Sequence, residues 1–134
     1  MKKVITAINI SLVLLLFLSA CSSKIDNKIT FQNFASNAVH VNFRATLITV
    51  EAGKSVEITE IARGQYSYQT TYEVPSGTTT SKEVGDVSGT VELNSSTKIL
   101  IVYSSTFVEG TYTIGATKTS SDEQSGGGGD PIGP

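Results

Sequence analysis

The sequence has few of the residue types from which proteins build covalent cross-links and metal sites. Its 134 residues include one cysteine, one histidine and no tryptophan. A single cysteine excludes a disulfide bond within the chain, and a single histidine excludes a metal site with several histidine ligands. No glycine-rich loop opens a helix to hold phosphate groups. The sequence therefore predicts neither a metal nor a cofactor.

Charged residues are also sparse, and neither sign is clustered. Ten basic and twelve acidic residues give a net charge of −2. Binding to nucleic acid depends on Lys and Arg side chains gathered on one surface. Because the sequence contains no basic run, we expect no nucleic-acid partner.

The N-terminus has the charge and hydropathy pattern of an export signal. Met1-Lys2-Lys3 is positively charged, and Val4–Phe17 is a mostly apolar run of 14 residues. A helix that spans a bilayer needs about 20 apolar residues. The run is therefore more typical of the central part of a secretory signal peptide.

The next four residues, Leu18-Ser19-Ala20-Cys21, resemble the lipobox of bacterial lipoproteins, in which Leu, a small residue and Ala or Gly precede the cysteine. The resemblance implies attachment of lipid to the Cys21 thiol and cleavage before Cys21. Residues 1–20 would then be the signal peptide and residues 21–27 a lipidated tether to a membrane. The alternative is an ordinary signal peptide or an uncleaved anchor helix, in which Cys21 has no role.

The resemblance also bears on localisation within the cell envelope. In lipoproteins of bacteria with two membranes, Asp directly after the cysteine is associated with retention at the inner membrane. Ser22 and Ser23 stand there in this chain. This implies the outer membrane for a cell that has two.

Residues 28–119 predict one all-β domain. Val, Ile, Thr, Tyr and Phe recur, and no segment has helical periodicity. Turn signals at intervals of about 8–12 residues are typical of an antiparallel β-sandwich or a small barrel, here with seven to eight strands. The expected strands are 28–34, 38–44, 46–50, 55–61, 65–74, 83–93, 98–104 and 111–117.

Two of these strands carry more specific expectations. Residues 83–93 predict a strand that is broken near Gly85 and Gly89, where bulges would fit. The run Ile99–Tyr103 is apolar at every position, which predicts a central strand covered on both faces. Residues 120–134 are polar and rich in glycine, and we expect a disordered tail.

Two short segments, Gly53–Ile58 and Gly64–Tyr68, have a strand, a glycine turn and an aromatic-bearing strand. In this they resemble small envelope β-sandwich modules of the PEGA and carboxypeptidase-regulatory types. The resemblance implies a fold class and no particular activity.

No group of residues predicts a catalytic site, so we expect no enzyme. His40 should lie on the solvent-facing side of its strand with Asn42 and Arg44, and no nucleophile motif accompanies it. The alternative is a small envelope enzyme acting on glycan or peptide. That alternative requires His40 to lie within reach of a carboxylate in a concave site.

Three tyrosines are the candidate binding residues. Tyr66, Tyr68 and Tyr72 share one face of their predicted strand. If exposed, they could contact sugar rings or a protein surface; if buried, which we favour, they form one wall of the core. The sequence thus predicts a non-catalytic binding or structural module, with an envelope protein or a glycan as its partner.

Overall fold

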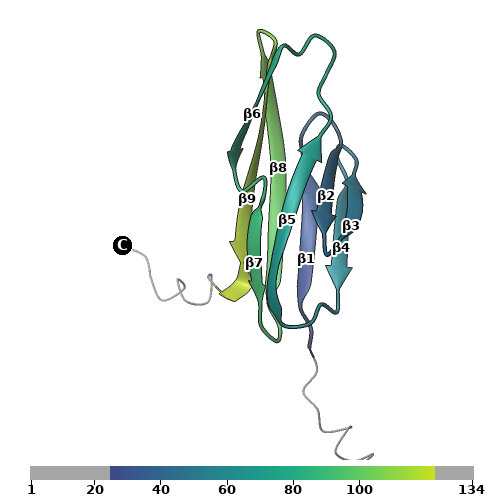
Figure 1. Ribbon diagram of the computed structural model, residues 1–134, viewed down its shortest axis with the longest axis vertical. Coiled ribbons are helices and arrows are strands. Elements are labelled where there is room, and N and C mark those ends of the chain that lie inside the picture. The colour runs from purple at the N-terminus through teal and green to yellow at the C-terminus, as the bar shows by residue number, and fades with distance from the viewer. Residues whose placement is uncertain (1–24, 123–134) are drawn as a thin grey trace, which may run out of the picture.

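The computed structural model describes residues 25–122, which form two β-sheets that pack face to face (Figure 1). One sheet has five strands in the order β4-β1-β8-β9-β6, and the other has four in the order β3-β2-β5-β7. The strands within this range are β1 (Lys28–Asn33), β2 (Val39–Phe43), β3 (Thr46–Val50), β4 (Ser55–Thr59), β5 (Gly64–Tyr72), β6 (Thr80–Gly85), β7 (Gly89–Leu93), β8 (Lys98–Val108) and β9 (Thr111–Ser120).

The prediction of an all-β fold is confirmed, whereas the barrel alternative is wrong, because the two sheets of the described range do not close on one another. Residues 1–24 and 123–134 lie outside the described residues. The predicted signal peptide, Cys21 and most of the predicted tail are therefore not covered by the structure.

The expectation of an antiparallel fold holds only for the four-stranded sheet. In the other sheet β1 pairs parallel with β8, and β6 pairs parallel with β9. The second pairing arises because the connection after β5 crosses the end of the sandwich before β6 begins (Figure 1). There the amide of Thr79 donates to the carbonyl of Gly110, 2.7 Å away, so β6 starts beside the start of β9 and runs with it.

The predicted break near Gly85 and Gly89 is present, but the parts on either side of it belong to different sheets and do not form one interrupted strand. Strand β6 ends at Gly85 and β7 begins at Gly89. Gly85 has a φ of 77°, and a Cβ at this position would collide with the carbonyl oxygen of Ala116. Glycine thus permits the chain to leave one sheet, and Val87, only 1% exposed, then packs into the core between them.

Strand β8 is central, as predicted, but it is covered on one face only. Ile99, Ile101 and Tyr103 point inward and are buried. On the outer face Leu100 is 38% exposed, because the described range provides no third layer over this sheet. The apolar run therefore reflects a central position within a sheet and not burial on both sides.

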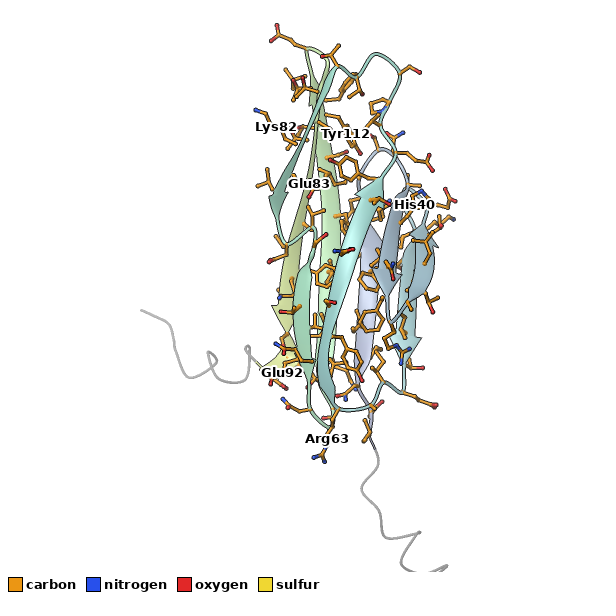
Figure 2. All side chains as sticks on the ribbon, in the orientation of Figure 1. His40, Arg63, Lys82, Glu83, Glu92 and Tyr112 are labelled. Carbon is orange, nitrogen blue, oxygen red and sulfur yellow. The ribbon has the colours of Figure 1, made fainter. Side chains whose placement is uncertain are left out.

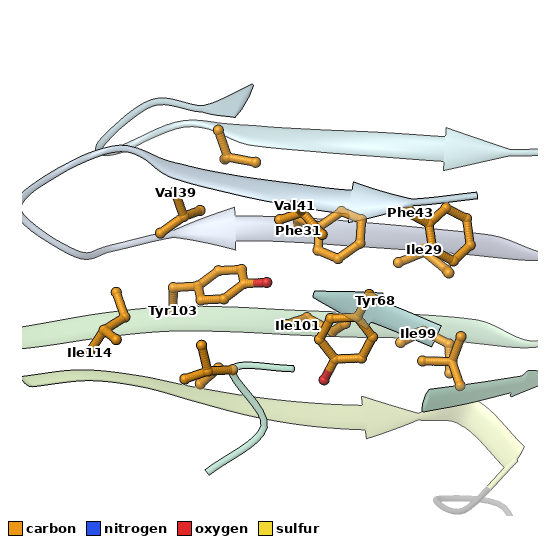
Figure 3. Close-up of a cluster of buried hydrophobic side chains, with 14 of the residues drawn as sticks. Ile29, Phe31, Val39, Val41, Phe43, Tyr68, Ile99, Ile101, Tyr103 and Ile114 are labelled. Atoms are coloured by element: carbon orange, nitrogen blue, oxygen red, sulfur yellow. The ribbon is translucent and has the colours of Figure 1, made fainter. Parts of the chain in front are cut away.

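The core lies between the two sheets and follows the predicted alternation. Along β2, Val39, Val41 and Phe43 are buried, as expected from their spacing. Figure 3 shows these side chains facing those of the five-stranded sheet. The ring of Phe31 lies edge-on to Phe43 and Tyr68, with centroid distances of 6.4 and 6.3 Å.

Two fully buried asparagines lie at the ends of β1: Asn27 directly precedes it, and Asn33 is its last residue. The amide of Asn27 donates to the carbonyls of Ile61 and Asn94, and its oxygen accepts from the amide of Thr97. These bonds join the segment before β1 to the starts of β5 and β8 and the end of β7. Asn27, which the sequence places in the tether, thus belongs to the fold.

Asn33, at the other end of β1, makes a matching set of contacts. Its amide donates to the carbonyls of Asn37 and Val50, and its oxygen accepts from the amide of Ala35. Val50 ends β3 in the opposite sheet. One side chain therefore shapes the β1–β2 connection and ties the two sheets together.

We predict that Asn27→Ala lowers the free energy of unfolding by about 3 kcal/mol, because it leaves buried backbone groups without partners. Urea unfolding of the lipid-free chain 22–134 measures this. Asn42→Ala is the matched control: Asn42 is exposed, and its loss should change stability by less than about 0.5 kcal/mol. Equal effects of the two substitutions would contradict the structural role of Asn27.

Candidate functional site

The outer face of the four-stranded sheet carries a polar hollow of about 480 Å³. Outward side chains of β2 and β5 meet there, with Asn42 directly opposite Gln69 in the strand register. We call this site the amide hollow. Its lining residues are Asn42, Arg44, Ala45, Gln65, Tyr66, Ser67 and Gln69.

Most of the polar side chains in the amide hollow have hydrogen-bonding capacity to spare. Within residues 25–122, the side chains of Asn42, Gln65, Ser67 and Gln69 form no hydrogen bond with another protein group. Each amide has two N–H donors and a carbonyl acceptor. The hollow can therefore offer an array of donors and acceptors to a ligand.

A second hollow, of about 310 Å³, lies beside β7 and β9. In contrast to most of those in the amide hollow, several of its polar side chains are hydrogen-bonded to other protein groups. The ammonium group of Lys118 donates to the carbonyl of Thr90, 2.6 Å away. The carboxylate of Asp122 accepts from the side chains of Asn94 and Thr97. Since these polar groups bind one another, the second hollow is better explained by the stability of this end of the sandwich.

The turn between β2 and β3 places two residues of the amide hollow in a strained conformation. Arg44 and Ala45 have φ values of 53° and 61°, and Phe43 pairs with Thr46 across a two-residue loop. Both central residues of such a type I′ turn need positive φ, which Asn and Gly adopt most easily. For other residues this region costs about 1–2 kcal/mol each.

The guanidinium group of Arg44 is held over an aromatic ring. Its Cζ lies 5.3 Å from the centroid of the Phe43 ring, within the range of a cation–π contact. Phe43 in turn packs against Tyr66, with ring centroids 5.5 Å apart. The strained turn and this stack together fix Arg44 at the edge of the hollow.

Of the three candidate tyrosines, only Tyr66 is among the residues that line the amide hollow, and its ring packs inward against Phe43. Tyr66 is partly buried, and its hydroxyl donates to the carbonyl of Ala62. Tyr68 is 1% exposed and donates to the carbonyl of Asp86, whereas Tyr72 packs partly buried against the core with its ring 6.0 Å from that of Tyr112. The shared face of these tyrosines is thus mainly a wall of the core.

Burial changes the acidity of two core tyrosines. Burial is the main cause that raises the pKa of Tyr68 well above its ordinary value, and the neighbouring Tyr103 and Asp86 raise it further. Burial likewise raises the pKa of Tyr103 to about 12, although its hydrogen bond with Thr70 acts in the opposite direction. That bond, 2.8 Å long, joins β8 to β5 across the core.

His40 lies on the outer face of β2, as the sequence predicts, and has two partners. Its Nε2 is 3.0 Å from a carboxylate oxygen of Glu73, and its Nδ1 is 3.0 Å from the hydroxyl of Thr49. His40 is thus within reach of a carboxylate, but it lines neither hollow. Figure 2 shows it well separated from Glu83 and Glu92.

Sequence reasoning missed most of the amide hollow. Asn42 and Arg44 were expected on the solvent side of β2, but Gln65, Ser67 and Gln69 were not singled out. Their signal is an outward polar series on β5 that alternates with the tyrosines. Strand pairing decides which outward residues of two strands lie side by side. The local sequence pattern does not contain that pairing.

The tyrosine pKa values predict how stability depends on pH. Both are raised above the unfolded value of 10.0, so the stabilisation is complete below about pH 10 and is lost as the pH rises towards 12. A shift of about two units at Tyr103 corresponds to about 3 kcal/mol. Urea unfolding between about pH 9 and pH 12 measures the loss. Tyr103→Phe should reduce the slope; an unchanged slope would contradict this assignment.

No group of three or more His, Cys, Asp or Glu residues in the described range is placed to hold a metal ion. No helix found there is long and apolar enough to cross a membrane. In comparisons with known proteins, no family model matches the chain and no curated protein is significantly similar to it.

Proposed function

We propose that the chain is an envelope lipoprotein, anchored through lipid on Cys21, whose β-domain binds a saccharide without catalysing a reaction. The lipobox-like segment Leu18–Cys21 supports the anchor. The observation that carries the binding function is the amide hollow, where four polar side chains lack protein partners.

The chemistry of the amide hollow favours a glycan over a protein partner. A sugar presents adjacent hydroxyl groups, each of which can donate and accept, and side-chain amides match this pattern. The ring of Tyr66, which alternates with the outward Gln65 and Ser67, packs inward against Phe43 and the core, so the side chains that the hollow presents are polar. Protein interfaces instead have a core that is more apolar than their rim, and Tyr66 is the one aromatic lining residue.

The anchor would place the amide hollow near the membrane. Cys21 precedes the first described residue, Ile25, by four positions, and four residues span at most about 14 Å. Asn27 binds the carbonyl of Ile61, just before β5 begins. Gln65 and Tyr66 therefore lie towards the end of the sandwich at which the tether enters.

The position of the hollow also supports a role without catalysis. Hydrolysis of a glycan typically uses two carboxylates, and neither Asp nor Glu is among the residues that line the hollow. An enzyme that used His40 would need its substrate against this histidine, which Glu73 and Thr49 flank. His40 is not among the residues that line the amide hollow. A ligand bound in the amide hollow would therefore lie away from His40.

The anchor is tested by replacing Cys21 in a bacterium that produces the full chain. We expect the wild-type protein to be in the membrane fraction and to incorporate labelled palmitate. Cys21→Ala should remove the label and release the protein, because a single residue with two or three acyl chains supplies the anchoring energy. A Cys21→Ala protein that stays in the membrane would contradict the proposed anchor.

The binding function is tested with the lipid-free chain 22–134 and purified cell-envelope polysaccharide. Replacing both Asn42 and Gln69 with Ala should weaken binding about tenfold or more, since hydrogen bonds of this kind contribute about 0.5–1.5 kcal/mol each. The control is Thr117→Ala, an exposed position of β9 on the other sheet. Absence of binding by the wild type, or equal binding by all three proteins, would refute the proposal.

A further inference from the structure

We propose that the amide hollow selects saccharides that carry a carboxylate group, and that Arg44 is the residue that determines this specificity. The inference rests on the proposed function and specifies which class of saccharide is bound. Three independent features of Arg44 support it: its charge, its support by aromatic rings and its strained backbone.

Arg44 is the one charged residue among those that line the amide hollow. The ion pairs of the described range are Lys28–Glu57, His40–Glu73 and Lys98–Asp26, so its guanidinium has no carboxylate partner there. A guanidinium matches a carboxylate with two parallel hydrogen bonds. A carboxylated sugar could thus place its charge on Arg44 and its hydroxyl groups on the amides of Asn42 and Gln69.

The aromatic rings beneath Arg44 preorganise its guanidinium group for contact with a carboxylate. The Phe43 ring under its Cζ is itself 1% exposed and packed against Phe31 and Tyr66. A side chain that is already held in place loses less conformational entropy when it binds a ligand. The stack is therefore an element of specificity as well as of stability.

The backbone of Arg44 shows that stability alone does not explain the residue. Its φ of 53° belongs to a region where Asn and Gly are far more favourable than Arg. Strain of this kind is often found at functional sites, where the side chain is needed for another purpose. The other two-residue hairpin with two positive φ values has Glu109 and Gly110, so that only one of its two positions is strained, whereas both Arg44 and Ala45 are strained here.

These features can be separated with one variant in each of the two-residue hairpins. Arg44→Asn removes the guanidinium and relieves strain but also loses the contact with the Phe43 ring, so it should weaken binding without lowering the melting temperature. Glu109→Asn relieves strain at a φ of 49° in the β8–β9 hairpin, outside the amide hollow, so it should raise the melting temperature by about 4–8 °C and leave binding unchanged. If the role of Arg44 were purely structural, Arg44→Asn would not weaken binding without also lowering the melting temperature.

Binding is measured by calorimetry with two matched pairs of probes, using the lipid-free chain 22–134. One pair is the disaccharide of N-acetylglucosamine and N-acetylmuramic acid with its neutral counterpart, chitobiose. The other is digalacturonate with its methyl ester. We expect the acidic member of at least one pair to bind about tenfold more tightly, with an affinity that falls as salt is added.

The outcomes distinguish the inference from the function on which it rests. Loss of the acidic preference in Arg44→Asn, with its retention in Glu109→Asn, supports the inference. Equal binding of acidic and neutral probes, or an acidic preference that survives Arg44→Asn, overturns the inference and leaves saccharide binding intact. Absence of binding by all four probes overturns the inference, and absence of binding to the cell-envelope polysaccharide as well overturns the proposed function.

Discussion

Burial of two asparagine side chains at the ends of β1 is the constraint on which the other parts of the fold depend. Asn27 joins the starts of β5 and β8 to the end of β7, and Asn33 ties the β1–β2 connection to the end of β3. β1 itself lies between β4 and β8 in the five-stranded sheet. An unsatisfied amide in the interior would be costly, so these contacts specify how the two sheets are joined.

The amide hollow is built on the opposite side of the strands that form the core. Asn42 lies between the buried residues Val41 and Phe43, and Gln69 lies between Tyr68 and Thr70. Because alternate residues of a strand point to opposite faces, packing of the core fixes where these outward amides stand. The proposed binding surface is thus preorganised by the hydrophobic core, and its one strained element is the turn at Arg44.

The sequence predicted what depends on local pattern, such as the all-β class and the inward face of β2. It did not predict the parallel pairing of β6 with β9 or the change of sheet after Gly85, because both depend on contacts between distant segments. The turn at Arg44 contains neither Asn nor Gly, the residues from which a type I′ turn is predicted in a sequence. The hollow was missed for a similar reason: Gln69 becomes part of a site only when β5 pairs with β2.

The most direct test of the amide hollow as a binding site is an NMR titration of the lipid-free chain with an acidic disaccharide, observing the side-chain amides of asparagine and glutamine. We predict that the signals of Asn42, Gln65 and Gln69 shift on binding. Those of Asn27 and Asn33, which are fully buried and hydrogen-bonded, should stay in place and provide an internal reference. Shifts confined to other surfaces, or none at all, would contradict the central claim that the amide hollow is the binding site.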